Sequence, residues 1–186
     1  MPIKPILFNT EMVRAILDGR KSCTRRIIKG FIPKDAQFGY TAFTPHGSIS
    51  CRGVFENEGY GEKFFKLPYQ IGDILYVRET VWQKIGYYLD VDGETKPSWY
   101  NEFRYVASDE KPENGWNYGW AKRPSIHMPK EAARIFLRVT NVRVERLQDI
   151  TVEDALAEGM DKYIRWDANP WVWGIEFERC EKPEGV

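Results

Sequence analysis

The sequence lacks the features of membrane-spanning and exported chains. Its longest uninterrupted apolar run is four residues, 74–77, whereas a membrane-spanning helix needs about 20. The N-terminal residues do not form the apolar core of a signal peptide. We therefore expect a soluble protein of the cytoplasm that makes no contact with a membrane.

Cysteine and histidine are scarce. The chain has three cysteines (Cys23, Cys51 and Cys180) and two histidines, His46 and His127. Because no two cysteines have the C-x-x-C spacing, a disulfide framework and a structural zinc site are both disfavoured. Walker A, G-x-G-x-x-G and G-x-S-x-G motifs are also missing. We expect neither a bound metal nor an organic cofactor.

Net charge is zero, with 27 basic and 27 acidic residues, but the charges are unevenly distributed. Residues 14–34 hold seven bases and one acid, and residues 145–186 hold eleven acids and five bases. A basic segment on a neutral protein favours a phosphate-bearing ligand. Alternatively, these bases are solvated or paired with the acidic C-terminal part.

The remaining composition indicates a compact globular chain. With 186 residues, 42% of them apolar and 15% aromatic, the chain has enough material for a core. Several short strand patterns with two short helix patterns predict the α+β class and a small barrel, not a parallel sheet. We expect a single domain over residues 1–186, with irregular insertions at about 30–70 and 84–122.

The clearest pattern is a strand followed by a helix near the N-terminus. Asn9 or Thr10 is expected to cap a helix over residues 11–18, which Gly19 ends. A second helix, over residues 151–158, is predicted from Thr151 and the Asp three residues later. Apolar runs or alternation predict further strands at 24–28, 74–77, 103–107, 135–144 and 171–177.

Several ordered motifs resemble those of the ASCH domain family. Residues 19–26, Gly-Arg-Lys-Ser-Cys-Thr-Arg-Arg, are similar to its G-[RK]-K-[ST]-x-[TE]-x-R signature. Residues 72–79 resemble its G-D-x-[IL]-x-[VI] strand, and residues 150–159 resemble its I-T-x-E-D-A-x-x-E-G helix. The longer phage- and prophage-type members also have a counterpart of residues 122–129.

This resemblance implies a PUA-like β-barrel with a cleft beside the first helix. The implied partner is RNA, a nucleotide or a modified nucleoside. Some small bacterial members are amidohydrolases that remove the acyl group from N4-acylated cytidine, and ribonuclease activity is attributed to others. Carried over by motif, the catalytic residues of such an enzyme would be Lys21, Thr24 and Glu158.

Amide hydrolysis needs a nucleophile, a base and a proton donor. Thr24 would supply the hydroxyl, and Lys21 the base, because neighbouring arginines favour its neutral form. The preceding helix end opposes this, since its dipole favours a cation. Glu158, at the end of its predicted helix, suits proton transfer. In the alternative reading, the lysine completes a helix end, the threonine lies in an edge strand, and the glutamate is an exposed helical residue.

A non-catalytic RNA- or nucleotide-binding module is the second hypothesis. It would use the basic segment 14–34, with bases stacked on aromatic side chains such as Trp82 or Tyr87. Turnover separates the two hypotheses. In either one, the residues expected to contact substrate or nucleic acid are Arg20, Arg25, Arg26, Arg78, Glu79, Trp82, Ser125 and His127.

Overall fold

The computed structural model describes residues 3–39, 47–55, 58–149 and 169–184, which belong to two compact units. The first unit comprises Lys21–Ile74 and Arg138–Glu178, and the second comprises Ile3–Arg20, Leu75–Leu137 and the residues from Arg179 onward. In chain order the elements are β1 (Ile3–Leu7), α1 (Thr10–Leu17), β2 (Cys23–Ile27), β3 (Gln37–Gly39), β4 (Ser48–Phe55), β5 (Gly59–Lys66), β6 (Ile74–Arg78), β7 (Val81–Leu89), β8 (Thr95–Tyr105), β9 (Tyr118–Arg123), the 3-10 helices η1 (Ser125–His127) and η2 (Lys130–Ala132), β10 (Phe136–Arg146), the 3-10 helix η3 (Leu147–Asp149) and β11 (Trp171–Cys180).

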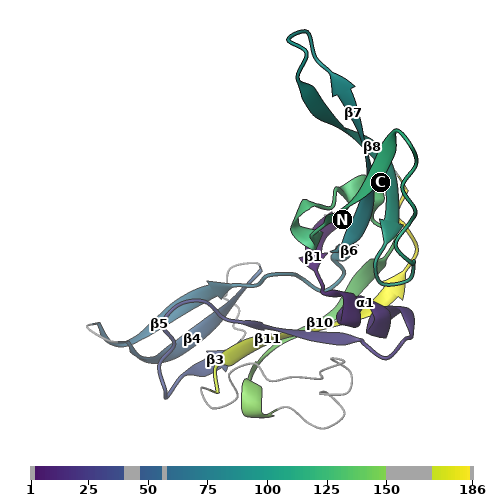
Figure 1. Ribbon diagram of the computed structural model, residues 1–186. Coiled ribbons are helices and arrows are strands. Elements are labelled where there is room, and N and C mark those ends of the chain that lie inside the picture. The colour runs from purple at the N-terminus through teal and green to yellow at the C-terminus, as the bar shows by residue number, and fades with distance from the viewer. Residues whose placement is uncertain (1–2, 40–46, 56–57, 150–168, 185–186) are drawn as a thin grey trace. The chain divides into compact units, whose positions relative to one another are not determined.

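These elements form three sheets, and strands far outnumber helices (Figure 1). The strand orders are β1-β6-β10-β11-β2, β3-β4-β5 and β8-β7-β9. This composition agrees with the α+β class. Closure of the five-stranded sheet into a barrel stays a prediction, because its strand order ends at β1 and β2.

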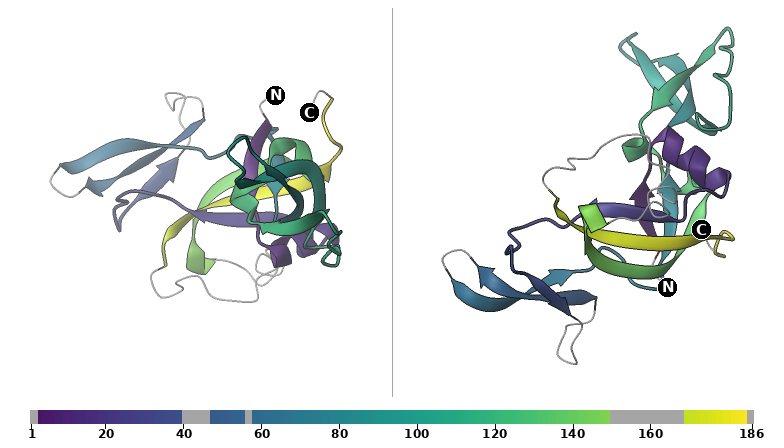
Figure 2. Two further views of the ribbon diagram at one scale, coloured as in Figure 1. Left: turned by 45° about the horizontal axis from the view of Figure 1, so that its top comes forward. Right: turned by 90° about the horizontal axis from the view of Figure 1, so that it is seen from below.

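In the first unit, β2 lies antiparallel to β11, which in turn neighbours β10 (Figure 2). Thr24 is opposite Ile175, and Arg26 is opposite Trp173. Ile175, Trp173 and the intervening Gly174 are all buried. Because successive side chains of a strand point to opposite faces, β11 is covered on both faces.

The second unit contains α1, which begins and ends as its sequence predicts. The Asn9 side chain accepts a hydrogen bond from the Met12 amide at 2.8 Å, and Gly19, just past the helix, has a φ of +73°. Glycine adopts this left-handed conformation without steric penalty. Val13 and Ile16 are buried, so the apolar face of α1 packs into the unit.

The predicted strands at 24–28, 74–77 and 171–177 correspond to β2, β6 and β11. Residues 84–122, for which the sequence predicts a single strand and otherwise irregular structure, contribute to the antiparallel sheet β8-β7-β9, in which the β7–β8 register shifts between Gln83 and Ile85. In the same way, β4 and β5 form a hairpin of eight-residue strands within residues 30–70. The helix predicted at 151–158, with Glu158, lies outside the described residues. No helix in the described part of the chain has the length and apolar character needed to cross a bilayer.

Candidate functional site

Strand β2 and the residues before it hold four of the predicted site residues. Lys21 and Thr24 are almost inaccessible, with 4% and 2% of their surface exposed. The Lys21 ammonium donates a hydrogen bond of 2.6 Å to the Cys23 carbonyl. Thr24 and Arg26 point to one face of β2, and Arg25 points to the other.

Arg25 belongs to an ion-pair network with β10 and β11. Its Nε lies 2.6 Å from Glu145 Oε1, and only 3% of the arginine side chain is exposed. The other Glu145 oxygen accepts from Arg143 Nε at 2.8 Å, and Arg143 also pairs with Glu176. A Cβ on Gly174, opposite Arg25, would lie 2.8 Å from Glu145 Oε1. The glycine therefore leaves the space through which Glu145 reaches Arg25.

On the other face, Arg26 lines a cavity that lies entirely within the first unit. This cavity, which we call the β2 pocket, has a volume of about 420 Å³. Its described lining includes no acidic residue and combines three cations with aromatic and aliphatic groups: Arg26, Ile27, Ile28, Lys29, Phe65, Lys66, Pro68 and Trp173. The pocket thus offers flat apolar surface and positive charge together.

Tyr69 follows the pocket residue Pro68, and the charge of Arg26 affects its pKa. Burial raises the pKa of the Tyr69 phenol, the Arg26 guanidinium lowers it, and the Asp73 carboxylate raises it. Burial is the largest of these effects. The positive potential of Arg26 therefore extends to the side chain that follows the pocket.

The second unit holds the other predicted residues that the structure describes. Exposed Arg20 pairs with Asp18 at 2.9 Å. Arg78 donates to the Met128 carbonyl at 2.9 Å and also to the Ile126 carbonyl, which fixes the segment that carries η1. Within η1, Ser125 is half-buried and His127 is exposed.

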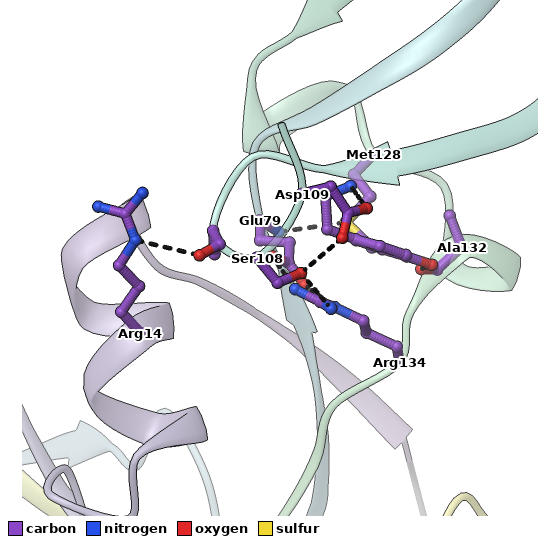
Figure 3. Close-up of polar contacts among 9 residues, drawn as sticks. Arg14, Glu79, Ser108, Asp109, Met128, Ala132 and Arg134 are labelled. Carbon is purple, nitrogen blue, oxygen red and sulfur yellow. Dashed lines mark hydrogen bonds and ion pairs between the residues drawn. The ribbon is translucent and has the colours of Figure 1, made fainter. Parts of the chain in front are cut away.

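Glu79 lies in a polar cluster of the second unit (Figure 3). The carboxylate is 1% exposed and accepts two hydrogen bonds from Arg134, at 2.9 and 3.0 Å. Arg134 also donates to Ser108 at 2.7 Å and lies 4.0 Å from the centre of the Tyr105 ring. The Tyr105 hydroxyl donates to the Ala132 carbonyl, and burial raises its pKa. These contacts join β6 to the ends of β8 and η2.

Trp82 is the remaining predicted residue, and it lies on β7. The ammonium groups of Lys111 and Lys122 each lie 5.8 Å from its ring centre. These distances are within the range of cation–π attraction. Trp82 thus has cationic neighbours in the second unit.

Sequence reasoning missed several residues at these sites. Phe65 and Lys66 of the β2 pocket lie on β5, inside a segment expected to be irregular. Glu145, the partner of Arg25, is 120 positions away in the sequence. Among these residues, only Trp173 was indicated by the sequence, because the alternation of 171–177 predicts a strand there. The other contacts depend on strand pairing that no local pattern encodes.

Among the described residues, no group of three or more His, Cys, Asp or Glu side chains is placed to hold a metal ion. Cys23 and Cys51 are buried, and burial raises the pKa of the Cys51 thiol. Comparisons of the chain with protein-family models, curated proteins and solved structures gave no match.

Proposed function

We propose that the protein binds a nucleotide, free or as part of an RNA, in the β2 pocket. The observation that carries this proposal is the pocket lining as far as the structure describes it, in which Arg26, Lys29 and Lys66 lie beside Phe65 and Trp173 and no residue is acidic. A nucleotide combines a flat base with an anionic phosphate, so its binding site needs both aromatic and cationic groups. The cavity of about 420 Å³ lies within the range of small-molecule sites.

Each part of the ligand has a matching group. Bases stack on aromatic rings in sites that recognise unpaired nucleotides, and Phe65 and Trp173 offer such rings. The guanidinium of Arg26 has a fork of donors that matches phosphate geometry, while the two lysines act as point charges. A phosphate is therefore expected at the cationic side and a base at the aromatic side.

The resemblance to ASCH domains supports the same class of ligand. The signature-like residues 19–26 lead directly into β2 and include the pocket residue Arg26. In this proposal the five-stranded sheet is part of a PUA-like barrel, and β2 is the strand that presents the ligand site.

Deacylation of N4-acylated cytidine is a second candidate, and one observation favours it. Thr24 lies two residues before Arg26 on the same face of β2, which places the two Cα atoms about 7 Å apart. Lys21 is buried beside the start of the same strand. A cytidine that contacts Arg26 in the β2 pocket would thus lie close to Thr24, the proposed nucleophile, which is two residues away along the strand.

Titration with a nucleotide tests the binding proposal. Cytidine 5′-monophosphate is expected to change the fluorescence of the protein saturably, because Trp173 lines the pocket. Cytidine and inorganic phosphate are each expected to bind more weakly. Lys66→Gln is expected to lower the affinity several-fold. The matched control is Lys63→Gln on the same strand, because Lys63 pairs with Glu58 and does not line the pocket. Equal weakening by both variants, or no saturable signal, would contradict the proposal.

Incubation with N4-acetylcytidine tests the second candidate. If it holds, the nucleoside is deacylated in the presence of a chelator, and Lys21→Met and Thr24→Val each remove most of the turnover. Because residues that act as one unit lose activity non-additively, the double variant should be little worse than either. Glu158→Gln should lower the rate and leave binding nearly unchanged. Turnover that survives all three substitutions, in variants with wild-type melting temperatures, would overturn this candidate.

A further inference from the structure

The sheet β8-β7-β9 of the second unit has one face rich in both rings and cations. Its strands pair antiparallel, with β7 in the centre. We call this face the Trp82 face; it consists of Trp82, Lys84, Tyr100, Arg104, Tyr118, Trp120 and Lys122. Because side chains alternate along each strand, Arg123 and Trp99 belong to the opposite face, where they lie 4.3 Å apart.

Cross-strand register arranges the Trp82 face as alternating rings and charges. Trp82 on β7 lies between Arg104 on β8 and Lys122 on β9. Two positions further along β7, Lys84 lies opposite Trp120. Each cation therefore has an aromatic neighbour on the adjacent strand.

The next position on this face of β7 is Gly86, which makes room for a ring. A Cβ at Gly86 would lie 2.9 Å from atoms of the Tyr100 side chain. Tyr100 therefore extends over the backbone of the central strand, and nearly half of its surface is exposed. Because Gly86 has no side chain, the Tyr100 ring covers this position, which thus becomes part of the aromatic surface.

Several cations of this face lie over its rings. Lys84 Nζ is 4.4 Å from the centre of the Tyr118 ring and 5.7 Å from that of Tyr100. The Arg104 guanidinium is 5.4 Å from the Trp120 ring. These contacts hold the rings in place while leaving the charges near the surface, where Arg104 and Lys122 are exposed.

The Glu102 carboxylate pairs with two cations of this cluster, Lys84 and, at 3.8 Å, Arg104. The Glu102 side chain accepts a hydrogen bond from Lys84 at 2.8 Å, and this bond is the largest cause of the raised pKa of Lys84. Lys84 is therefore protonated at neutral pH. With Lys111 beside Trp82, the face presents four cations against one carboxylate.

An uncharged cavity shares two rings with this face. It has a volume of about 570 Å³ and runs along β9, where its lining combines Tyr118 and Trp120 with Ile85 and Tyr87, which belong to the opposite face of β7. Trp116, which also lines it, is 97% exposed. Because none of the described residues that line it is charged, this cavity suits a neutral flat group and not a phosphate.

We propose that the Trp82 face is a second binding surface, and that its partner is a single-stranded nucleic acid. Bases would stack on Trp82, Tyr100 and Trp120. When bases stack on the rings, the lysines and Arg104 would give up their cation–π contacts and bind the phosphates of the strand. Neither interaction involves the sugar, so RNA and DNA strands fit equally. A duplex fits poorly, because its bases are already stacked and paired. This proposal does not depend on the β2 pocket.

Fluorescence anisotropy with labelled 12-nucleotide oligo(U) and oligo(dT) tests this surface. Both strands are expected to bind within a few-fold of each other, with an affinity that falls as salt rises. Lys122→Gln is expected to weaken binding several-fold and to reduce the salt slope by about 0.7. The neighbouring Arg123→Gln removes the same charge from the opposite face and is expected to change little.

A ring substitution separates stacking from charge. Trp120→Leu on the Trp82 face is expected to weaken binding about tenfold, whereas Trp99→Leu on the opposite face is expected to have little effect. The variant Lys66→Gln of the β2 pocket separates the two sites, because in its background Trp120→Leu should still weaken oligonucleotide binding about tenfold and Trp99→Leu should still change it little. The proposal is overturned if neither strand binds, if each variant and its opposite-face control weaken binding equally, if a 12-base-pair duplex binds as tightly, or if one sugar is preferred more than tenfold. All variants are first checked for wild-type melting temperatures.

Discussion

The two faces of strand β2 use adjacent arginines in opposite ways. Arg25 is buried against Glu145 in a network that joins three strands. Arg26, the next residue, lines the β2 pocket, and no carboxylate is among the described residues of that lining. Both side chains carry the same charge, and both belong to the same signature-like segment. What differs is the charge that the neighbouring strands bring to each face.

This difference shows what a count of basic residues can and cannot indicate. Part of the charge excess of residues 14–34 is offset by acids outside that segment, because Arg14 pairs with Glu11 and Arg25 pairs with Glu145. Arg26, in contrast, lines a pocket whose described residues include no acid. We therefore expect the Arg25 face to determine stability and the Arg26 face to determine binding.

Removing the carboxylate from the Arg25 face should have the largest effect. Glu145→Ala leaves a guanidinium that is only 3% exposed without its partner, and loss of one member of a buried pair costs about 3 kcal/mol or more. Urea unfolding measures this loss. Replacing both members, as in Arg25→Met with Glu145→Leu, should cost less than the single change. A loss below about 0.5 kcal/mol for Glu145→Ala, the size of an ordinary surface substitution, would mean that this pair is not structural.

Filling the space at Gly174 should have the next largest effect. In Gly174→Ala the new methyl group would meet Glu145 Oε1 at 2.8 Å and Arg143 at 3.2 Å. Crowding of this kind typically costs about 1–3 kcal/mol. The same substitution should cost less in a Glu145→Ala background, because the crowded oxygen is gone. Additive losses in the double variant would show that Gly174 does not serve the Arg25 network.

Substitution of Tyr69, the residue that follows the pocket residue Pro68, should have a smaller effect on the unfolding free energy, visible at alkaline pH. Burial raises the folded-state pKa of Tyr69 above its ordinary value of 10.0, although Arg26 partly opposes this. Its contribution to stability is thus fully present below about pH 10 and is lost as pH rises through the folded pKa. Tyr69→Phe should lessen the decline in unfolding free energy above pH 10. An unchanged decline would assign it to other groups, such as Tyr105, whose pKa burial also raises.

Local elements were predictable where one pattern dominates. The cap at Asn9, the apolar positions of α1 and the left-handed Gly19 all act within a few residues, so the sequence predicts the helix correctly. The apolar runs of β6 and β11 also identified buried strands.

The sheet β8-β7-β9 was largely missed because its sequence has no clean alternation. Both faces of β7 carry aromatic side chains, such as Trp82 on one and Tyr87 on the other, so polar and apolar residues do not alternate. Gly86 and Pro97 also resemble turn residues. In the structure, the glycine accommodates Tyr100, and the proline lies on β8, an edge strand that tolerates it.

The candidate site was predictable in type but not in detail. The resemblance singled out residues 19–26, and the structure places Arg26 of that segment in a cationic, aromatic pocket. Which arginine lines a cavity depends on Glu145, Phe65 and Trp173, which come from distant strands. Only the tertiary packing therefore distinguishes the role of Arg25 from that of Arg26.

The most direct test of the account compares Arg25→Gln with Arg26→Gln in the same nucleotide titration. Both variants remove one positive charge from neighbouring positions. Arg26→Gln should weaken binding of cytidine 5′-monophosphate about tenfold, since a charge-assisted contact contributes roughly 1.5–3 kcal/mol, and should lower the urea midpoint less than Arg25→Gln does. Arg25→Gln should lower the midpoint while the folded protein keeps its affinity within about twofold. The opposite assignment, or equal loss of affinity in both variants, would contradict the account.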